Sequence, residues 1–341
     1  MLYRMVMELF TRGVNFVVPH GMWYDKNHIR IPPLVSPESK KLVSDLPAYS
    51  DYVARSSYLL RGGKSVAEIG IMYPIESLQG NYYFEEPENR VPGDWAYPEA
   101  DYQEVGRILS NRLHRDFTFI HPEYFASKKY KISGTKIRLE NDTTPQSYRV
   151  LIIPGGSVAS LKSLQKIKQF YDNGGKVIAT TLLPTQSAET GKDAEIRQII
   201  RELFGKNASK NAKVQTSKRN GKAFFIRKLT EKNLAKALNR VEPFPDILFS
   251  KQPEIQSELG VFSYLHKVKD GQDIYLFANS GDHSIQTDVL LRGEKTLSAW
   301  NPHTGVQSAT LKTKRINKKG QIYTKVFLDL PRVQSVFWVS Q

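Results

Sequence analysis

The stretch GVNFVVPHGMWYD, residues 13–25, begins as an apolar run and ends in a cluster of polar and aromatic side chains. The apolar part, residues 14–18, predicts a short buried strand that stops at Pro19. In parallel α/β architectures the functional residues lie just beyond the carboxyl ends of the strands. The stretch therefore predicts a pocket rim that carries His20, Trp23, Tyr24 and Asp25.

Each side chain of this rim suits a hydroxyl-rich, ring-shaped ligand. His20 could hydrogen-bond a substrate hydroxyl or act as an acid–base group. Trp23 and Tyr24 could stack on the apolar face of a ring, and Asp25 could accept hydrogen bonds from hydroxyls. The alternative interpretation is a satisfied buried histidine beside ordinary core aromatics. We favour the functional interpretation because the polar and aromatic groups gather directly after a strand end.

Composition narrows the class of protein. A chain of 341 residues, 40% of them hydrophobic, can build two or three domains with real cores. The sequence has no cysteine, which excludes disulfides, zinc–thiolate sites and thiol nucleophiles. It contains neither a run of about 20 apolar residues, as a membrane span requires, nor a visible signal peptide. Residues 2–11 instead read as an amphipathic helix, as if the chain were entered in the middle of a domain.

The net charge of +15 raises the question of a nucleic-acid partner. The densest basic runs, Lys206–Lys222 and Lys312–Lys319, contain Gly or Asn and read as solvated loops. No nucleic-acid-binding motif accompanies them. We expect no nucleic-acid partner and no membrane partner, and a nucleic-acid surface remains an alternative that rests on charge alone.

The periodicity divides the chain into three regions. The first contains helix 2–11, strand 14–18 and helix 47–60, the repeat of a parallel α/β sheet or barrel. The second alternates strands with helices and predicts a doubly wound, mostly parallel sheet. From residue 259 the period changes to two, with frequent turns, which predicts an antiparallel sandwich of seven strands. Those strands are expected at 261–268, 273–279, 285–291, 296–300, 306–312, 321–329 and 333–339.

Two further stretches are weaker candidates for chemistry. Residues 74–94 read as a loop with several carboxylates, and a pair of carboxylates is the minimum for glycoside hydrolysis. A solvated loop is the favoured interpretation for Glu76, Glu85 and Glu86. Pro154-Gly155-Gly156 lies between a strand and a helix, where an anion could bind, but a tightly packed turn is the favoured interpretation. No nucleophile elbow, metal-ligand spacing or nucleotide-binding motif is present, so neither a metal nor a cofactor is predicted.

Four stretches carry a resemblance to a known family. GVNFVVPHGMWYD and LPAYSDYVARSSYLLRGGKSVAEIGIMYP resemble the end of the catalytic barrel of large glycoside hydrolases, with the alpha-L-rhamnosidase family 106 as the nearest match. That resemblance implies an α/β domain similar to class I glutamine amidotransferases, followed by β-sandwich domains. DIYLFANSGDHSIQTDVLLRG and AWNPHTG are similar to the family's terminal sandwich.

The resemblance implies a carbohydrate substrate. The chain departs from the family's pattern in two respects. Without cysteine, the amidotransferase-like domain cannot hydrolyse glutamine through a thiol, so it should shape the pocket or form an interface in a homo-oligomer. Most of the barrel is missing, so the family's acid and base carboxylates do not map onto these residues and the catalytic residues stay unknown. Only His20, Trp23, Tyr24 and Asp25 carry over, as sugar contacts. Family members are periplasmic or secreted, and an export signal would lie upstream of residue 1.

Together these features predict an α/β plus all-β protein with three parts. They are the end of a (β/α) barrel over residues 1–62, a flavodoxin-like domain over 63–250 and a β-sandwich over 251–341. The expected function is that of a glycoside hydrolase segment acting on O-glycosidic bonds of plant or microbial polysaccharides, with alpha-L-rhamnosides as a candidate substrate. The alternatives are a non-catalytic carbohydrate-binding or interaction protein, and an incomplete enzyme that lacks its catalytic carboxylates.

Overall fold

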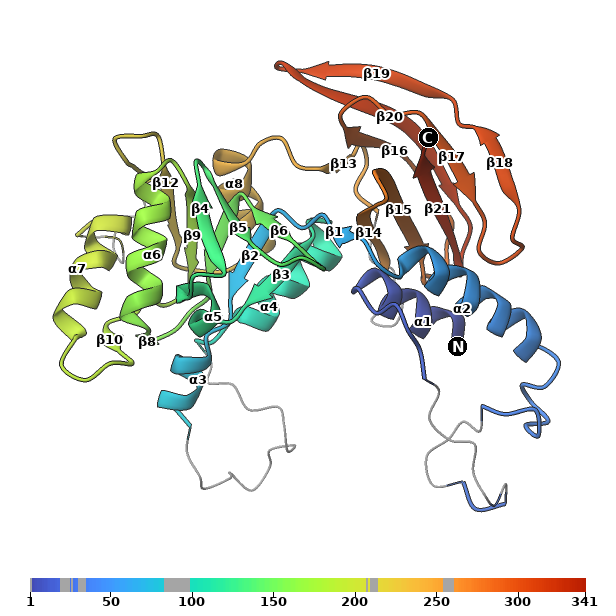
Figure 1. Ribbon diagram of the computed structural model, residues 1–341, viewed down its shortest axis with the longest axis horizontal. Helices are drawn as coiled ribbons and strands as arrows, with labels where there is room; N and C mark the ends of the chain where they lie inside the picture. The colour runs from blue at the N-terminus through green and yellow to red at the C-terminus, as the bar shows by residue number, and fades with distance from the viewer. Residues whose placement is uncertain are drawn as a thin grey trace. The chain divides into compact units, whose positions relative to one another are not determined.

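The chain folds into two units, and the second is inserted into the first. A computed structural model describes residues 2–18, 25, 27–29, 35–82, 99–206, 208, 214–253 and 261–341. Unit 1 combines Met1–Ser65 with Ile247–Gln341, and unit 2 is Val66–Asp246 (Figure 1). Mixed and antiparallel sheets with helices confirm the expected combination of an α/β part with an all-β part.

Unit 2 contains a six-stranded sheet in the order β11-β12-β9-β7-β2-β3. Only the short edge strand β11 (Gln215–Thr216) runs antiparallel to its neighbour. The five parallel strands follow the order 2-1-3-4-5 of flavodoxin-like doubly wound sheets, which confirms the predicted topology. They are β2 (Ile69–Met72), β3 (Phe117–Ile120), β7 (Val150–Ile153), β9 (Lys176–Thr180) and β12 (Lys222–Ile226).

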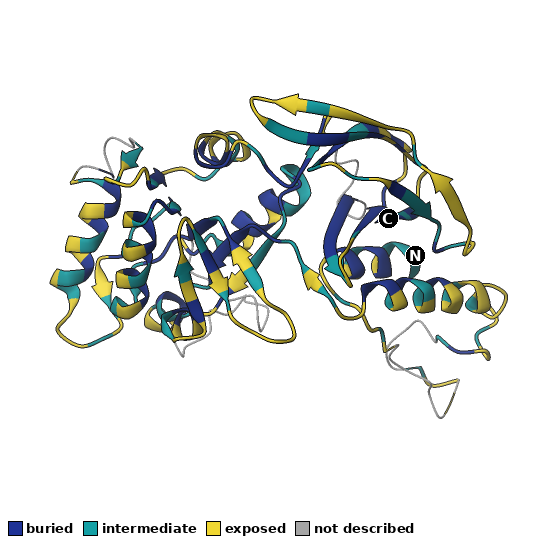
Figure 2. Cartoon of the chain, turned by 45° about the horizontal axis from the view of Figure 1, so that its top comes forward, coloured by how far each residue is buried: buried dark blue, intermediate teal, exposed yellow. Residues whose placement is uncertain are grey.

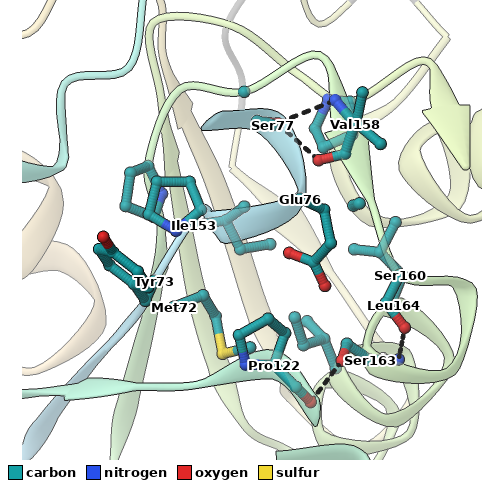
Figure 3. Close-up of a pocket in the computed structure, with 16 residues that line it drawn as sticks. Met72, Tyr73, Glu76, Ser77, Pro122, Ile153, Val158, Ser160, Ser163 and Leu164 are labelled. Carbon is teal, nitrogen blue, oxygen red and sulfur yellow. Dashed lines mark hydrogen bonds between the residues drawn. The ribbon is translucent and has the colours of Figure 1, made fainter. Parts of the chain in front are cut away.

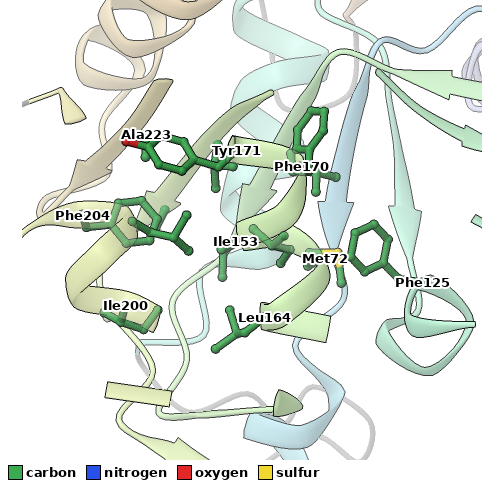
Figure 4. Close-up of a cluster of buried hydrophobic side chains, with 14 of the residues drawn as sticks. Met72, Phe125, Ile153, Leu164, Phe170, Tyr171, Ile200, Phe204 and Ala223 are labelled. Atoms are coloured by element: carbon green, nitrogen blue, oxygen red, sulfur yellow. The ribbon is translucent and has the colours of Figure 1, made fainter. Parts of the chain in front are cut away.

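Apolar residues on both faces of these strands build two separate cores. On one face α4 (Tyr102–Arg107), the π-helical turn η1 (Ile108–Arg112) and α8 (Glu231–Val241) pack against the strands. On the other face the core includes Phe125, Leu164, Phe170 and Phe204 (Figure 4). Those residues come from α5 (Pro122–Ala126), α6 (Leu161–Asp172) and α7 (Asp193–Phe204). The sheet is therefore buried on both faces, which is why its strands read as continuous apolar runs.

Smaller elements complete unit 2. An antiparallel hairpin consists of β4 (Tyr130–Ser133) and β5 (Lys136–Leu139), and β6 (Gln146–Tyr148) extends it. β8 (Val158–Ala159) pairs in parallel with β10 (Gln186–Ser187). Helix α3 (Ile75–Gly80) lies in the stretch predicted as a loop, so that prediction is wrong for residues 75–80. Glu85 and Glu86 lie outside the described residues.

The Asp101 carboxylate ties the carboxyl ends of two central strands together. It accepts hydrogen bonds from the Gly155 N–H after β7 at 2.8 Å, from Thr180 Oγ1 at 2.8 Å and from Thr181 Oγ1 at 2.5 Å. Thr181 has φ of +52°, a left-handed conformation that is costly for a β-branched residue. A Cβ on Gly155 would lie 2.0 Å from the Glu99 carbonyl oxygen, which confirms the tightly packed Pro154-Gly155-Gly156 turn.

Unit 1 is an antiparallel sandwich with the period-two pattern expected from sequence. One sheet has the order β1-β14-β15-β21-β17-β18 and the other β13-β16-β20-β19. The sheets enclose a core that includes Phe249, Tyr275, Phe277 and Trp338. Their strands are β1 (Lys64–Ser65), β13 (Ile247–Phe249), β14 (Phe262–Lys269), β15 (Gln272–Asn279), β16 (Ile285–Arg292), β17 (Leu297–Trp300), β18 (Gln307–Thr310), β19 (Thr313–Lys318), β20 (Gln321–Leu330) and β21 (Gln334–Ser340).

Helices α1 (Leu2–Thr11) and α2 (Leu46–Leu60) cover the other face of the six-stranded sheet. Val6, Met7 and Phe10 of α1 and Tyr52 of α2 share one core with apolar residues of β15 and β21. Residues 274–278 of β15 alternate strictly between this core and the core of the sandwich. The two helices, expected as part of residues 1–62, thus fold with the sandwich. Their derivation from a (β/α) barrel stays a prediction.

The strand predicted over residues 14–18 is wrong for this structure. The segment pairs with no strand among the described residues, and Phe16 and Val18 are 69% and 76% exposed. An apolar run forms a buried strand only when neighbouring strands hydrogen-bond to its backbone N–H and C=O groups. The apolar run therefore indicates only that residues 14–18 favour an extended backbone. The described part of the chain contains no strand that pairs with them.

The structure contradicts part of the prediction that the two basic runs form loops. Lys312–Lys319 contains β19, an exposed edge strand that pairs with β20, so the loop prediction is wrong there (Figure 2). Its backbone supplies the pairing, and its charged side chains suit an unpaired sheet edge. The run Lys206–Lys222 is described only in part, and that part includes β11. No described helix combines the length and the apolar character that crossing a bilayer demands.

We predict that Asp101→Asn destabilises unit 2 by about 2–3 kcal/mol, because an amide replaces a carboxylate that accepts three hydrogen bonds. The matched control is Asp172→Asn, which removes an exposed carboxylate paired with Lys168 one helical turn away and should cost about 0.5 kcal/mol or less. Denaturant unfolding of both variants measures the difference. Equal, small losses for the two variants would contradict the role given to Asp101.

We also predict that protonation of His303 destabilises unit 1. The imidazole lies against the Tyr52 ring at 4.4 Å between centroids, and its Nε2 accepts the Ser335 backbone N–H at 3.2 Å. Burial lowers the pKa of His303 from 6.5 to about 4. Because the unfolded chain binds the proton more readily, stability is complete above pH 6.5 and falls as the pH drops towards 4.

The His303→Gln variant tests this assignment. Its free energy of unfolding should lose the part of the pH dependence due to His303, up to about 3 kcal/mol and less where solvent screens the partly exposed ring. Val306→Ala, which removes a 64% exposed, non-titrating side chain next to the same turn, is the control and should keep the original pH profile. Parallel profiles for His303→Gln and the unaltered protein would show that another group carries the dependence.

Candidate functional site

The structure describes one of the four residues predicted to contact sugar. His20, Trp23 and Tyr24 lie outside the described residues. Asp25 is exposed, and its carboxylate accepts hydrogen bonds from the Asn27 N–H at 2.9 Å and from His28 Nδ1. The first of these bonds and then the second lower the pKa of Asp25. Asp25 is thus an ionised hydrogen-bond acceptor on the surface.

A pocket lies at the carboxyl edge of the parallel sheet in unit 2. The strand order reverses between β2 and β7, and crevices at such a reversal are the usual ligand sites of open α/β sheets. Tyr73 and Pro74 follow β2, and Pro154 and Gly156 follow β7, and all four line the pocket (Figure 3). Its cavity volume is about 40 Å³, enough for one or two water molecules.

Glu76 points into this pocket from the first turn of α3 (Figure 3). Burial raises the pKa of Glu76, although the backbone N–H groups of Glu76 and Ser160 and the charge of His121 act in the opposite direction. The nearby Glu189 carboxylate adds to the increase. Glu76 is therefore a carboxyl group with an increased tendency to hold its proton.

A wider cavity of about 590 Å³ adjoins Glu76 and Ser160. Its lining is rich in groups that form hydrogen bonds, and includes Gln79, His121, Glu123, Lys162 and Glu189. Burial alone would raise the pKa of Glu189, but hydrogen bonds from the Leu161 N–H and from Ser187 and Ser160 lower it overall. Glu76 and Glu189 thus line one cavity with pKa values shifted in opposite directions, the pattern of an acid paired with a base.

The contacts of Glu189 limit what this pair can do. Its oxygens accept the Leu161 N–H at 2.8 Å, Ser187 Oγ at 2.7 Å and Ser160 Oγ at 3.1 Å. Glu189 therefore helps to cap the N-terminus of α6 together with the N-cap residue Ser160, which is a structural role. The cavity is suited to binding a polar molecule more than to acid–base chemistry. The described residues include no cluster of three or more His, Asp or Glu side chains able to hold a metal ion.

Sequence reasoning named Glu76 but favoured a solvated loop for it, and it missed the other polar groups at this edge of the sheet. Asp101, His121, Thr181 and Glu189 come from four separate connections, and only the sheet topology brings them to one edge. A usable signal was present, because His121 and Thr181 each follow directly after a strand. Polar residues at that position of a parallel strand are candidates for a site at the carboxyl edge.

Comparison with known proteins places the chain among glycosidase relatives. A protein of Formosa agariphila provisionally named a beta-glucuronidase is 26% identical over 264 residues, which cover 76% of this chain and 18% of that protein. A rhamnosidase from Novosphingobium sp. PP1Y superposes with a TM-score of 0.65 at 19% identity, covering 99% of this chain and 29% of the other. A beta-galactosidase from Bacillus circulans sp. alkalophilus gives 0.55 at 10% identity, covering 89% and 46%.

The chain thus spans less than a third of the length of the first two of these proteins. The two structural neighbours share its fold, at identities too low to carry more than that. Residues 39–313, which include most of both units, match the alpha-L-rhamnosidase family of glycoside hydrolases. The chain belongs to the alpha-L-rhamnosidase family, glycoside hydrolase family 106.

Proposed function

We propose that the chain takes part in the hydrolysis of O-glycosidic bonds, with alpha-L-rhamnosides as its substrate class. The observation that carries this proposal is the family match over residues 39–313, which extends through the α/β unit into the sandwich. Glycoside hydrolysis passes through an oxocarbenium-like transition state and normally uses two carboxyl groups, one as acid and one as base or nucleophile. We propose that this chain contributes mainly by contacting the substrate, and not by supplying the catalytic carboxyl groups.

The proposed sugar contacts are His20, Trp23, Tyr24 and Asp25. Support comes from the two helices on either side of them in sequence, because α1 and α2 are both buried on the sheet of unit 1. The chain between these helices is therefore attached at each end to a packed core. Asp25 adds an exposed, ionised carboxylate that could accept hydrogen bonds from a sugar.

The acid and base of the reaction are not assigned to residues of this chain. In the part of the chain that the structure describes, Glu76 and Glu189 are the carboxylates with opposite pKa shifts in a shared cavity, and Glu189 is held by three donors of its own unit. We therefore expect the 341-residue chain by itself to be a poor catalyst or none. The alternative function is a non-catalytic carbohydrate-binding or interaction protein. It is supported by the engagement of Glu189 with donors of its own unit, which leaves no acid–base pair among the described residues of this cavity.

Two structural proposals accompany this function. Residues 1–62 correspond to the end of a (β/α) barrel, supported by the apolar run at 14–18 with its exposed Phe16 and Val18. Unit 2 corresponds to an amidotransferase-like domain, supported by its flavodoxin-like strand order. Because the chain has no cysteine, this unit would serve as a structural module and not as a thiol-dependent glutaminase. An interface in a homo-oligomer stays a prediction.

We predict that L-rhamnose binds saturably to the chain and that Trp23→Ala and His20→Ala each weaken binding about tenfold, through lost stacking and a lost hydrogen bond. Titration followed through the backbone N–H resonance of Asp25, which every variant retains, measures the dissociation constant. Tyr124→Ala removes a 57% exposed tyrosine of unit 2 and should leave it unchanged.

A parallel assay of 4-nitrophenyl alpha-L-rhamnoside cleavage tests the catalytic half of the proposal. We expect turnover far below the about 1–1,000 s⁻¹ of ordinary enzymes. If the chain turns over at such rates and His20→Ala does so equally well, the assigned contacts are wrong. If rhamnose does not bind and no cleavage occurs, the substrate class is wrong.

A further inference from the structure

A second cavity lies within unit 1, between α2 and the turn that joins β17 to β18. Its volume is about 410 Å³, within the range of about 300–1,000 Å³ typical of small-molecule sites. Aromatic rings and hydrogen-bonding side chains line it together, namely Tyr58, Trp300, Arg55, Asn301 and Gln307. Ala54, Leu59 and Pro302 add apolar surface. This is a mixed lining, and none of the described residues in it also lines the pocket of unit 2.

The turn that forms one wall is rigidly held. Asn301 Oδ1 accepts the His303 N–H at 2.8 Å, and the Asn301 N–H donates to the Val306 carbonyl at 2.8 Å. Gly305 has φ of +79°, and a Cβ there would lie 3.1 Å from Arg55 Nε, so glycine allows the guanidinium to pack on the turn. The wall is thus organised before any ligand arrives, which lowers the entropic cost of binding.

The guanidinium of Arg55, the charged group in the lining, already donates hydrogen bonds within the protein. Arg55 Nη1 donates to the Pro302 and His303 carbonyls, both at 3.2 Å, and Nη2 donates to Asp51 at 3.1 Å. Lys269 Nζ lies 5.2 Å from the centre of the Tyr58 ring and donates to the Tyr58 carbonyl at 3.2 Å. These cations serve α2 and the turn, so the cavity is not built for an anion.

We propose that this cavity is a second saccharide site, which binds a neutral pyranose. The apolar C–H face of such a ring fits aromatic side chains, and its hydroxyls fit the amides of Asn301 and Gln307. Tyr58 is 65% exposed, so its ring is accessible to a ligand in the cavity. The site holds glycan and takes no part in bond cleavage, so it is independent of the proposed function.

The indole N–H resonances of Trp300 and Trp338 provide an internal comparison. Trp300 lines the cavity and its Nε1–H donates to Ser298 Oγ at 3.1 Å, whereas Trp338 is 3% exposed in the core of the sandwich. Titration of the intact chain with L-rhamnose, D-galactose and D-glucuronate should shift Trp300 saturably with at least one neutral sugar. Trp338 should stay in place, and glucuronate should bind more weakly than the neutral sugar.

Tyr58→Ala and Gln307→Ala should each weaken that binding by about three- to tenfold. Tyr124→Ala is closely matched to Tyr58→Ala, because it too removes an exposed tyrosine with a lysine ammonium over its ring, Lys129 Nζ at 5.3 Å. It should change nothing, and an unmoved Trp338 resonance shows that each variant is folded.

Three results would overturn this proposal. They are no saturable Trp300 shift with any of the three sugars, equal affinity in Tyr58→Ala and Tyr124→Ala, and tighter binding of glucuronate than of the neutral sugars. The Trp23 resonance reports separately on the proposed sugar contacts at residues 20–25. Loss of its response would count against that function and leave the unit 1 site standing.

Discussion

The burial of α1 and α2 on one face of the six-stranded sheet is the contact on which unit 1 depends. It joins two segments that are separated in sequence by the whole of unit 2. Phe10, Tyr52 and Phe337 are completely buried in this shared core. At about 25 cal/mol per Å² of apolar surface removed from water, the burial of such side chains offsets part of the cost of ordering the two helices. The insertion of unit 2 leaves this core intact.

The same core gives the functional proposals their geometry. The residues proposed to contact sugar lie in the chain between α1 and α2, so both ends of that segment begin from fixed positions. The cavity next to Tyr58 exists because α2 lies on the sheet beside the turn at residues 301–306, with Arg55 bridging the two. If the helices did not share the core of the sheet, this cavity would not form between α2 and that turn.

Periodicity alone predicted most of the regular structure. Helix 2–11 was predicted with the bounds that the structure has and strand 285–291 to within one residue, because each has a strong apolar periodicity. The edge strand β19 was not predicted, since its sequence TKRINK has no apolar alternation and its pairing uses backbone groups. Residues 14–18 failed in the opposite way, because an apolar run does not reveal whether partner strands exist. The candidate sites were harder still, because Tyr58 with Trp300, and Glu76 with Glu189, meet only through tertiary packing.

Amide hydrogen exchange on the intact chain tests most directly whether the helices belong to the sheet. The shared core predicts that Phe10, Leu59 and Leu60 exchange within about tenfold of the rate of Leu276 in β15, because all would open in one cooperative step. Exchange of the helix amides more than about a hundredfold faster, with β15 still protected, would contradict the account. In that case α1 and α2 would be loosely attached, and the anchoring of the proposed sugar contacts would be lost.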